Sequence, residues 1–219
     1  MRQLFVTGAH TDVGKTYVAC AMLRAARAKG LSVAALKPAV SGIDEADWAQ
    51  SDPGRLLAAM GRPLTLAELD AIAPLRFTAP LSPPMAARRE GVDLRISTLT
   101  DFCRAGLAAS TADLMLVEGA GGVMSPMAED GTGLDLMATL GLPSVVVGGS
   151  YLGAISHTLT AIETLRARGL PIAAVVVSQS GEPDAPDFAQ TVDSVAAFAG
   201  EVRIIAAARG EEAWARELV

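Results

Sequence analysis

The chain has 219 residues, of which 51% are hydrophobic and 19% are charged, and its formal net charge at pH 7 is −6. This composition is too apolar for a disordered chain, yet no apolar run reaches the roughly 18 to 20 residues that a membrane-spanning helix needs. The acidic balance gives no general electrostatic reason to bind nucleic acid or an anionic membrane, so an anionic ligand would have to be held by local positive groups.

The length is enough for one substantial core and short for two full domains, so we expect a single domain over residues 1–219. The two cysteines, Cys20 and Cys103, lie far apart inside apolar patterns and are interpreted as core thiols of a reducing compartment. No signal peptide is recognised before the first apolar segment. The expectation is a soluble, cytoplasmic protein.

Short apolar runs of strand length alternate with longer runs of helical pattern. In the first part of the chain we expect a strand at residues 4–7, a helix at 16–28 and a strand at 33–36, followed by an irregular proline-bearing stretch at 40–91 with a short helix near 54–60. A helix is then expected at 98–109, and strands at 114–117 and 144–147. The last part is expected to hold a helix at 154–168, a strand at 173–177, a helix at 185–199, a strand at 202–206 and a short tail helix. Such strands, apolar on both faces, predict an α/β fold with a mostly parallel sheet and helices on both faces.

One edge of this sheet is the expected place for a ligand. Right-handed crossovers bring the carboxyl ends of all parallel strands to the same edge, and ligands of such sheets bind there. Gly8, Lys37, Glu118 and Ser178 all stand at the ends of predicted strands. We therefore look for the chemistry of the protein among these residues and their neighbours.

Residues 8–16, with the sequence GAHTDVGKT, follow the first strand and open the first helix. This is the setting that a phosphate-binding loop requires, because backbone N–H groups and a helix N-terminus suit anionic phosphates. Lys15 is expected to neutralise the β- and γ-phosphates, and the Thr16 hydroxyl to ligate Mg²⁺. The loop is one residue longer than usual. A chance glycine-rich turn is disfavoured because strand, loop, Gly-Lys-Thr and helix coincide.

Three further charged residues are candidates for the same site. Glu118 ends an apolar strand and is followed by glycines, which places a carboxylate where the Mg²⁺ of a nucleotide could lie; an ordinary strand-end turn is the alternative. Lys37 lies on the same sheet edge as Lys15, although a lone lysine is usually solvated. Asp52 fits a helix N-cap and a metal ligand equally well. The histidines, His10 and His157, lack metal-ligand spacing.

Six segments occur together and in order: TGAHTDVGKT at 7–16, KPAVSG at 37–42, SD at 51–52, PLSP at 80–83, VEGAGG at 117–122 and LGAISH at 152–157. Over nearly the whole chain this combination resembles the dethiobiotin synthetase family. The resemblance implies a P-loop fold and a homodimeric, Mg²⁺- and ATP-dependent ligase. Such an enzyme carboxylates 7,8-diaminononanoate with CO₂, phosphorylates the carbamate and closes a cyclic urea, releasing ADP and phosphate.

The resemblance also implies roles for particular residues. Lys37 and Lys15 would be catalytic, and Mg²⁺ would be held by Thr16, Asp52 and Glu118. The nucleotide-binding residues would be Asp12, Val13, Gly14, Lys15, Thr16, Tyr17, Asp52, Glu118, Gly119, Ala120, Gly121, Ser178 and Gln179. The substrate-binding residues would be Thr11, Ser41, Leu152, Gly153, Ala154 and Ile155, the last four reaching the site from the partner subunit at the dimer interface.

The chain departs from the family pattern mainly at the end that would hold the base. Ser178 stands where the family commonly has an asparagine that reads adenine, and Ser156 replaces another asparagine. The late Gly-x-Ile-Pro segment is represented by AAAR at 206–209. We therefore expect the base to be held loosely and nucleotides to be discriminated weakly.

Rival functions remain on the same fold. A partner-regulated P-loop ATPase switch usually carries a second lysine early in the loop, but positions 9 and 10 are Ala9 and His10. Its membrane-bound forms end in a basic amphipathic helix, whereas this chain ends in EEAWARELV. A non-catalytic nucleotide-binding module would bind nucleotide without turnover that depends on a diamine. An amidoligase would need an ammonia source, for which no glutaminase domain remains.

Overall fold

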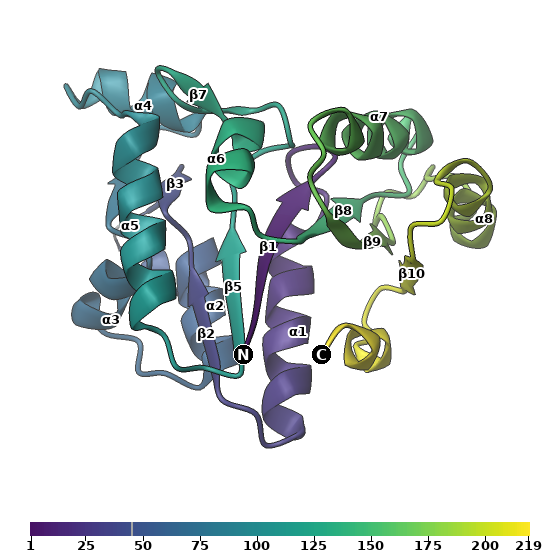
Figure 1. Ribbon diagram of the computed structural model, residues 1–219, viewed down its shortest axis with the longest axis horizontal. Helices are drawn as coiled ribbons and strands as arrows, with labels where there is room; N and C mark the ends of the chain where they lie inside the picture. The colour runs from purple at the N-terminus through teal and green to yellow at the C-terminus, as the bar shows by residue number, and fades with distance from the viewer. Residues whose placement is uncertain (45) are drawn as a thin grey trace.

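The computed structural model describes residues 1–44 and 46–219. Its centre is a sheet of six parallel strands in the order β10-β9-β8-β1-β5-β2. Their bounds are β1 Arg2–Gly8, β2 Val33–Leu36, β5 Leu114–Glu118, β8 Ser144–Gly148, β9 Ile172–Ser178 and β10 Ile204–Ala207. The carboxyl ends of the strands point to one edge (Figure 1). The α/β prediction is confirmed.

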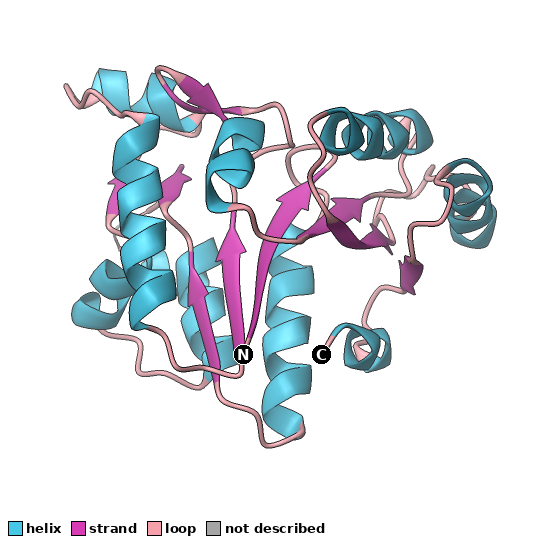
Figure 2. Ribbon diagram, viewed as in Figure 1, coloured by secondary structure: helices cyan, strands magenta, loops and turns pink. Residues whose placement is uncertain are grey.

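Helices cover both faces of the sheet (Figure 2). One face carries α1 Lys15–Ala28, α2 Asp52–Met60, α3 Leu66–Ile72 and the 3₁₀ helix η2 Ala213–Leu218. The other carries α4 Pro83–Arg89, α5 Ile96–Ala109, α6 Gly133–Leu140, α7 Ala154–Ala167 and α8 Phe188–Phe198. Of the described residues, none belongs to a helix long and apolar enough to cross a membrane.

The central sheet divides the interior into two cores, and the side chains of β1 contribute to both. Successive side chains of a strand point to opposite faces, so Leu4 and Val6 pack with the α1 side and Phe5 packs with the α5 side. All three are almost fully buried. Because β1 has β8 on one side and β5 on the other, the loop that leaves its carboxyl end lies at the middle of the sheet edge.

The stretch at 40–91 is more regular than its prolines suggest. Besides α2, α3 and α4 it holds the 3₁₀ helix η1 Trp48–Gln50 and the parallel pair β3 Ala39–Ser41 and β4 Leu75–Phe77. A small antiparallel pair, β6 Pro126–Ala128 and β7 Gly131–Thr132, follows the glycine cluster after β5. Prolines stand at the starts of α2 and α4, where the missing N–H has no helical partner to lose.

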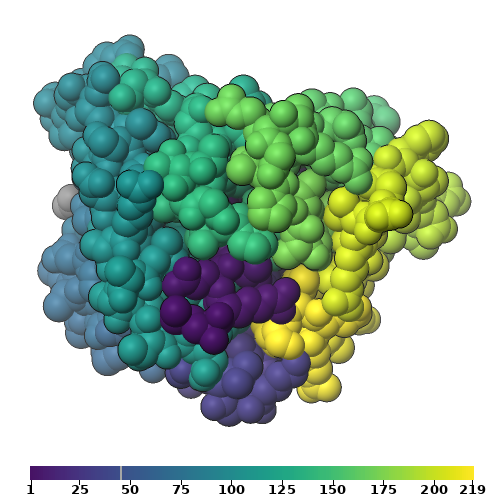
Figure 3. All heavy atoms as spheres, in the orientation of Figure 1, coloured from purple at the N-terminus to yellow at the C-terminus, as the bar shows by residue number. Residues whose placement is uncertain are grey.

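The C-terminal segment packs beside α1 rather than extending away. Figure 1 shows the C-terminal 3₁₀ helix beside α1, and in Figure 3 the yellow C-terminal residues lie next to purple residues of the N-terminal part of the chain. Lys29 donates a hydrogen bond to the carbonyl of Arg216 at 3.2 Å, and Tyr17 donates to the carbonyl of Glu211 at 2.6 Å. The tail is a 3₁₀ helix, and its Trp214 ring tilts against Tyr17 with centroids 5.9 Å apart.

Candidate active site

The loop between β1 and α1 makes two backbone turns that few residues tolerate. Gly14 has φ 95° and Asp12 has φ 58°, both in the left-handed region. A Cβ at Gly14 would also lie 2.9 Å from the Ser178 hydroxyl, so the end of β9 closes directly over the loop. Glycine at 14 is thus required by conformation and by space. α1 begins immediately afterwards, at Lys15.

A buried cluster of opposite charges lies beside this loop. Lys37 is 1% exposed, and its Nζ lies 2.6 Å from Glu118 Oε1 and 2.8 Å from Asp52 Oδ2. It also donates to the carbonyl of Gly119 at 3.1 Å. The Thr16 hydroxyl donates to the same Glu118 oxygen at 2.6 Å. Strand ends and helix starts distant in sequence therefore converge on one point, as the sheet-edge argument predicts.

The two lysines of the site differ in their electrostatics. Burial would lower the pKa of Lys37, but the carboxylates of Glu118 and Asp52 outweigh it and raise this pKa above its ordinary value. Lys15 is also buried, and its Nζ donates a long hydrogen bond of 3.3 Å to the carbonyl of His10. Burial, reinforced by the charge of Lys37, lowers the pKa of Lys15 to about 8. Lys15 is therefore the ammonium that gains most from a bound anion.

The oxygen donors of the cluster suit a hard divalent cation. Glu118 Oε2 is buried and has no hydrogen-bond partner among the described residues, which is costly for a carboxylate oxygen. The other oxygen of this carboxylate accepts from the Thr16 hydroxyl, which also hydrogen-bonds with Asp52, and such oxygens are the ligands that Mg²⁺ prefers. Thr16, Asp52 and Glu118 thus fit the ion that the sequence predicts.

The capping alternative for Asp52 does not match the structure. α2 begins at Asp52, and its N-cap is Ser51, whose hydroxyl donates instead to the carbonyl of Trp48. The Asp52 carboxylate pairs with Lys37. Burial would raise the pKa of Asp52, yet the charge of Lys37 and its hydrogen bond hold this pKa below its ordinary value. Asp52 belongs to the charged cluster.

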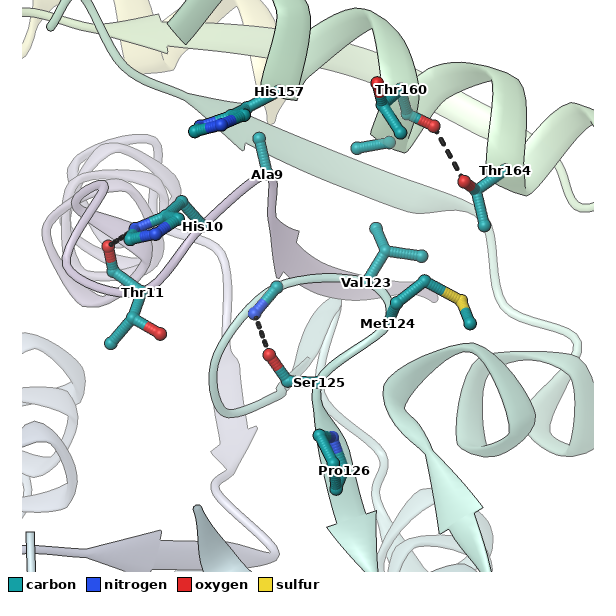
Figure 4. A pocket seen from close by; sticks show the side chains of 12 residues that line it. Ala9, His10, Thr11, Val123, Met124, Ser125, Pro126, His157, Thr160 and Thr164 are labelled. Carbon is teal, nitrogen blue, oxygen red and sulfur yellow. Dashed lines mark hydrogen bonds between the residues drawn. The ribbon is translucent and has the colours of Figure 1, made fainter. Parts of the chain in front are cut away.

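One cavity, of about 440 Å³, lies between residues 9–11 of the loop and helix α7 (Figure 4). Ala9, Val123 and Met124 give it apolar walls, and Thr11 and Ser125 contribute hydroxyls. At its rim the rings of His10 and His157 stack with centroids 5.5 Å apart. His10 Nδ1 donates to the carbonyl of Thr11 at 2.8 Å, because a carbonyl can only accept.

A second cavity, of about 990 Å³, lies on the other side of the loop. The phosphate-binding loop forms one wall, and the loops after β8, β9 and β10 form the others. Its lining includes Asp12, Val13, Gly14, Tyr17, Ser178, Gln179, Gly181, Arg209 and Gly210. Gln179 Oε1 accepts the backbone N–H of Arg209 at 2.9 Å, which joins the two outer loops. The loop therefore separates two spaces of different chemistry.

The predicted site residues fall into three groups. Lys15, Thr16, Lys37, Asp52, Glu118 and Gly119 meet in the charged cluster or beside it. Asp12, Val13, Gly14, Tyr17, Ser178 and Gln179 line the second cavity. Of the remainder, Thr11 lines the first cavity, Gly121 faces Ser125, Ala120 lies between Gly119 and Gly121, and Ser41 donates to the carbonyl of Leu81.

The last four predicted residues lie apart, at the start of α7. Gly153 is the N-cap with φ 94°, and Leu152 is 87% exposed. The structure of one chain does not bring Leu152, Gly153, Ala154 or Ile155 into the charged cluster. The sequence analysis placed Arg209 in the segment 206–209 at the base end but did not name it as a binding residue, and it missed His10 and His157 as a stacked pair. An arginine two residues after the last strand was the available signal for Arg209; none pointed to the stacked histidines.

Comparison with known proteins gives concordant results. The family model described as "AAA domain" matches residues 2–211. The chain is 59% identical over 219 residues to the ATP-dependent dethiobiotin synthetase BioD of Phenylobacterium zucineum, covering 100% of this chain and 94% of that one. It is 54% identical over 209 residues to that of Caulobacter vibrioides, with 95% and 93% covered. To that of Methylobacterium nodulans it is 47% identical over 215 residues, with 96% and 94% covered.

Solved structures resemble the fold at low identity. The MinC:MinD cell division protein complex of Aquifex aeolicus matches with a TM-score of 0.57 and 13% identity, covering 99% of this chain and 86% of that one. The hydrogenase maturation factor HypB of Archaeoglobus fulgidus matches with a TM-score of 0.54 and 14% identity, covering 100% and 88%. At such identities the likeness concerns the fold alone.

Proposed function

The chain belongs to the family of ATP-dependent dethiobiotin synthetases and is a ligase, and on that premise we propose that it converts 7,8-diaminononanoate, CO₂ and ATP into dethiobiotin, ADP and phosphate. The observation that carries this proposal is the buried cluster of Lys37, Glu118, Asp52 and Thr16 beside Lys15. Residues 1–219 act as one nucleotide-binding and ligase domain, and the cytoplasm supplies the substrates.

The reaction needs positioning and neutralisation of charge more than a nucleophilic side chain. One substrate amine bonds to CO₂ and loses a proton, which gives a carbamate. A carbamate oxygen then takes the γ-phosphoryl group of ATP, and ADP leaves. The second amine attacks the carbonyl carbon of this mixed anhydride, the ring closes and phosphate leaves. Each anionic stage is stabilised by fixed positive groups that are already in place.

The two lysines divide this work. Lys15, whose own contacts to the protein are weak, stabilises the β- and γ-phosphates together with the N–H groups of the loop. Lys37 exchanges part of its pairing with Asp52 for the carbamate and the transferred phosphoryl group. Asp52 is the exposed partner of the pair, with 41% of its side chain accessible, so this exchange does not strand a buried charge.

Thr16, Asp52 and Glu118 would hold Mg²⁺ with the nucleotide. The bound ion supplies further neutralisation of the phosphate oxygens during phosphoryl transfer. The unpartnered oxygen of Glu118 supports this assignment. The cavity beside His10 and Thr11 would take the alkyl chain of the substrate against Ala9, Val123 and Met124.

The active unit of this proposal is a homodimer. Residues 152–155, at the positive end of α7, would hold the substrate carboxylate in the site of the partner subunit. The exposure of Leu152 and Phe198, at 87% and 72%, supports a covered face here. Mixing Lys37→Ala subunits with subunits changed at Gly153→Val should restore activity in verified heterodimers, since one composite site stays intact. No recovery would mean that each site is built from one chain.

The proposal is tested by ADP release from the purified protein with ATP, Mg²⁺ and bicarbonate. We expect release only when 7,8-diaminononanoate is present, with dethiobiotin formed in equal amount and detected by mass spectrometry. Lys15→Met serves as the inactive control. ADP release that is independent of the diamine would favour a partner-regulated ATPase. Nucleotide binding without any turnover would favour a non-catalytic binding module.

A further inference from the structure

Arg209 occupies an unusual position on the wall of the 990 Å³ cavity. It follows β10 and faces the same space as Gly14 of the phosphate-binding loop and Ser178 at the end of β9. Within residues 1–44 and 46–219, its guanidinium forms no ion pair and donates no hydrogen bond, whereas its backbone N–H is bonded to Gln179. An arginine head that lines a cavity in an acidic chain is available to a ligand.

The guanidinium of Arg209 lies between two loops of the cavity wall. The guanidinium lies so close to Gly181 that a Cβ there would collide with Nη1 and Cζ. The loop beyond it is anchored by one carbonyl, that of Glu211, which accepts from Tyr17 Oη and from Trp214 Nε1, each at 2.6 Å. Arg209 is exposed, and it is presented to the cavity between two loops that contact each other.

Several polar side chains of the cavity, Ser178 and Gln179 among them, can reach only the edge of a bound ring. Gln179 Oε1 already accepts the backbone N–H of Arg209, and the N–H groups of its amide stay free to donate. The Ser178 hydroxyl sits against Gly14, and its reach is short. A planar guanidinium, by contrast, stacks on the face of any aromatic ring and gains from the attraction between a cation and a π system.

From this arrangement we infer that Arg209 binds the nucleobase by stacking on its face, so that it adds affinity for every nucleotide and discriminates little among bases. The inference rests on the proposed function in that a nucleotide occupies the loop, with its base in the larger cavity. Stacking is tolerant of base identity because every base has a π face. Purines, which offer two rings, gain more than pyrimidines.

The experiment measures dissociation constants by calorimetry for ADP, GDP, CDP and inorganic tripolyphosphate, with Mg²⁺ present. The variants are Arg209→Ala, Arg209→Lys and Gly181→Ala. Arg209→Ala should weaken ADP and GDP about tenfold and CDP about threefold, with tripolyphosphate unchanged, because it has no base. Arg209→Lys keeps the positive charge but loses the planar guanidinium, so it should bind ADP almost as weakly as Arg209→Ala does. Gly181→Ala displaces the guanidinium and should weaken ADP by about threefold.

Three outcomes would overturn the inference. An equal loss of tripolyphosphate and ADP binding in Arg209→Ala would make the residue a phosphate contact. Full recovery of ADP binding in Arg209→Lys would make its charge, not its face, the cause. Unchanged ADP binding would remove the role altogether. Failure of the proposed ligase reaction is distinguishable, since it would abolish diamine-dependent ADP release while leaving these binding differences intact.

Discussion

The two ends of the candidate nucleotide site are built on different principles. At the phosphate end, Lys37, Glu118 and Thr16 are buried and joined by short hydrogen bonds. At the base end, Ser178, Gln179 and Arg209 lie along a wide cavity and make few contacts. A charge is costly to bury unless its partners are fixed, so the first region must be preorganised. The second is less constrained, which agrees with the resemblance described in the sequence analysis, where the departures from the family pattern fall at this end.

The largest expected effects come from the two lysines. Lys15→Met and Lys37→Met should each lower kcat by two orders of magnitude or more, because each removes a positive charge from the reacting phosphates. Their effects on stability should differ. Lys15→Met removes a poorly paired buried ammonium, so the free energy of unfolding should hold or rise. Lys37→Met leaves Glu118 buried without its cation and should cost about 3 to 5 kcal/mol.

Activity assays and urea unfolding of both variants check this pair of expectations. A folded Lys15→Met protein with near-normal turnover would contradict the assignment of the loop. Equal loss of stability in the two variants would show that Lys15 is as well paired as Lys37, against the 3.3 Å hydrogen bond to His10.

The next largest effect concerns the predicted metal ligands. Glu118→Gln and Asp52→Asn should each raise the Mg²⁺ concentration for half-maximal activity about tenfold or more, because a neutral amide binds a hard cation less well than a carboxylate. A Mg²⁺ titration at saturating ATP measures the shift. An Asp52→Asn protein with a lowered melting temperature and an unchanged Mg²⁺ requirement would instead assign Asp52 a purely structural role. Ser51→Ala is the matched control at the neighbouring N-cap.

At the base end, Ser178→Asn should increase the discrimination among nucleotides and so make this region more like the preorganised phosphate end. An amide can donate and accept, so the variant should gain about 1 to 3 kcal/mol of discrimination for ATP over CTP and GTP. The measurement is kcat/KM for the three nucleotides in both proteins. If the unchanged protein already prefers ATP by several hundredfold and the variant behaves alike, the base is read by other groups.

The smallest expected effect is on the cysteines. Burial raises the pKa of Cys20 and of Cys103 to about 12 each. The folded thiols should therefore stay protonated at pH 9, where thiols of the unfolded chain ionise, and any stability that they contribute should fade as the pH rises from 9 toward 12. Iodoacetamide at pH 9 should label neither cysteine in the native protein and both in urea. Rapid native labelling, assigned with Cys103→Ala, would show that a core opens.

Sequence patterns predicted the parts of the molecule that are coded locally. The strand, loop and helix around Lys15 follow from a contiguous motif, and Glu118 and Lys37 follow from the rule that parallel strands end at one edge. The pairing of Lys37 with Asp52 depends on how α2 docks, and the contact of Arg209 with Gly181 depends on two loops that meet only after folding. The strands β3 and β4 pair across 36 residues within a proline-rich stretch that has no clear period. Long-range geometry of this kind leaves no local pattern.

The central place of β1 has a consequence for how the protein forms. Arg2 pairs with Leu114 and Phe5 with Ser144, so β1 has no neighbour in the central sheet until β5 and β8, more than a hundred residues later, have been made. Contacts of such sequence separation form slowly, and until they form the unpaired edges of β1 are prone to aggregation. We therefore expect the phosphate-binding loop, which directly follows β1, to become ordered only after β5 and β8 have paired with this strand, so that nucleotide binding is a late event in folding.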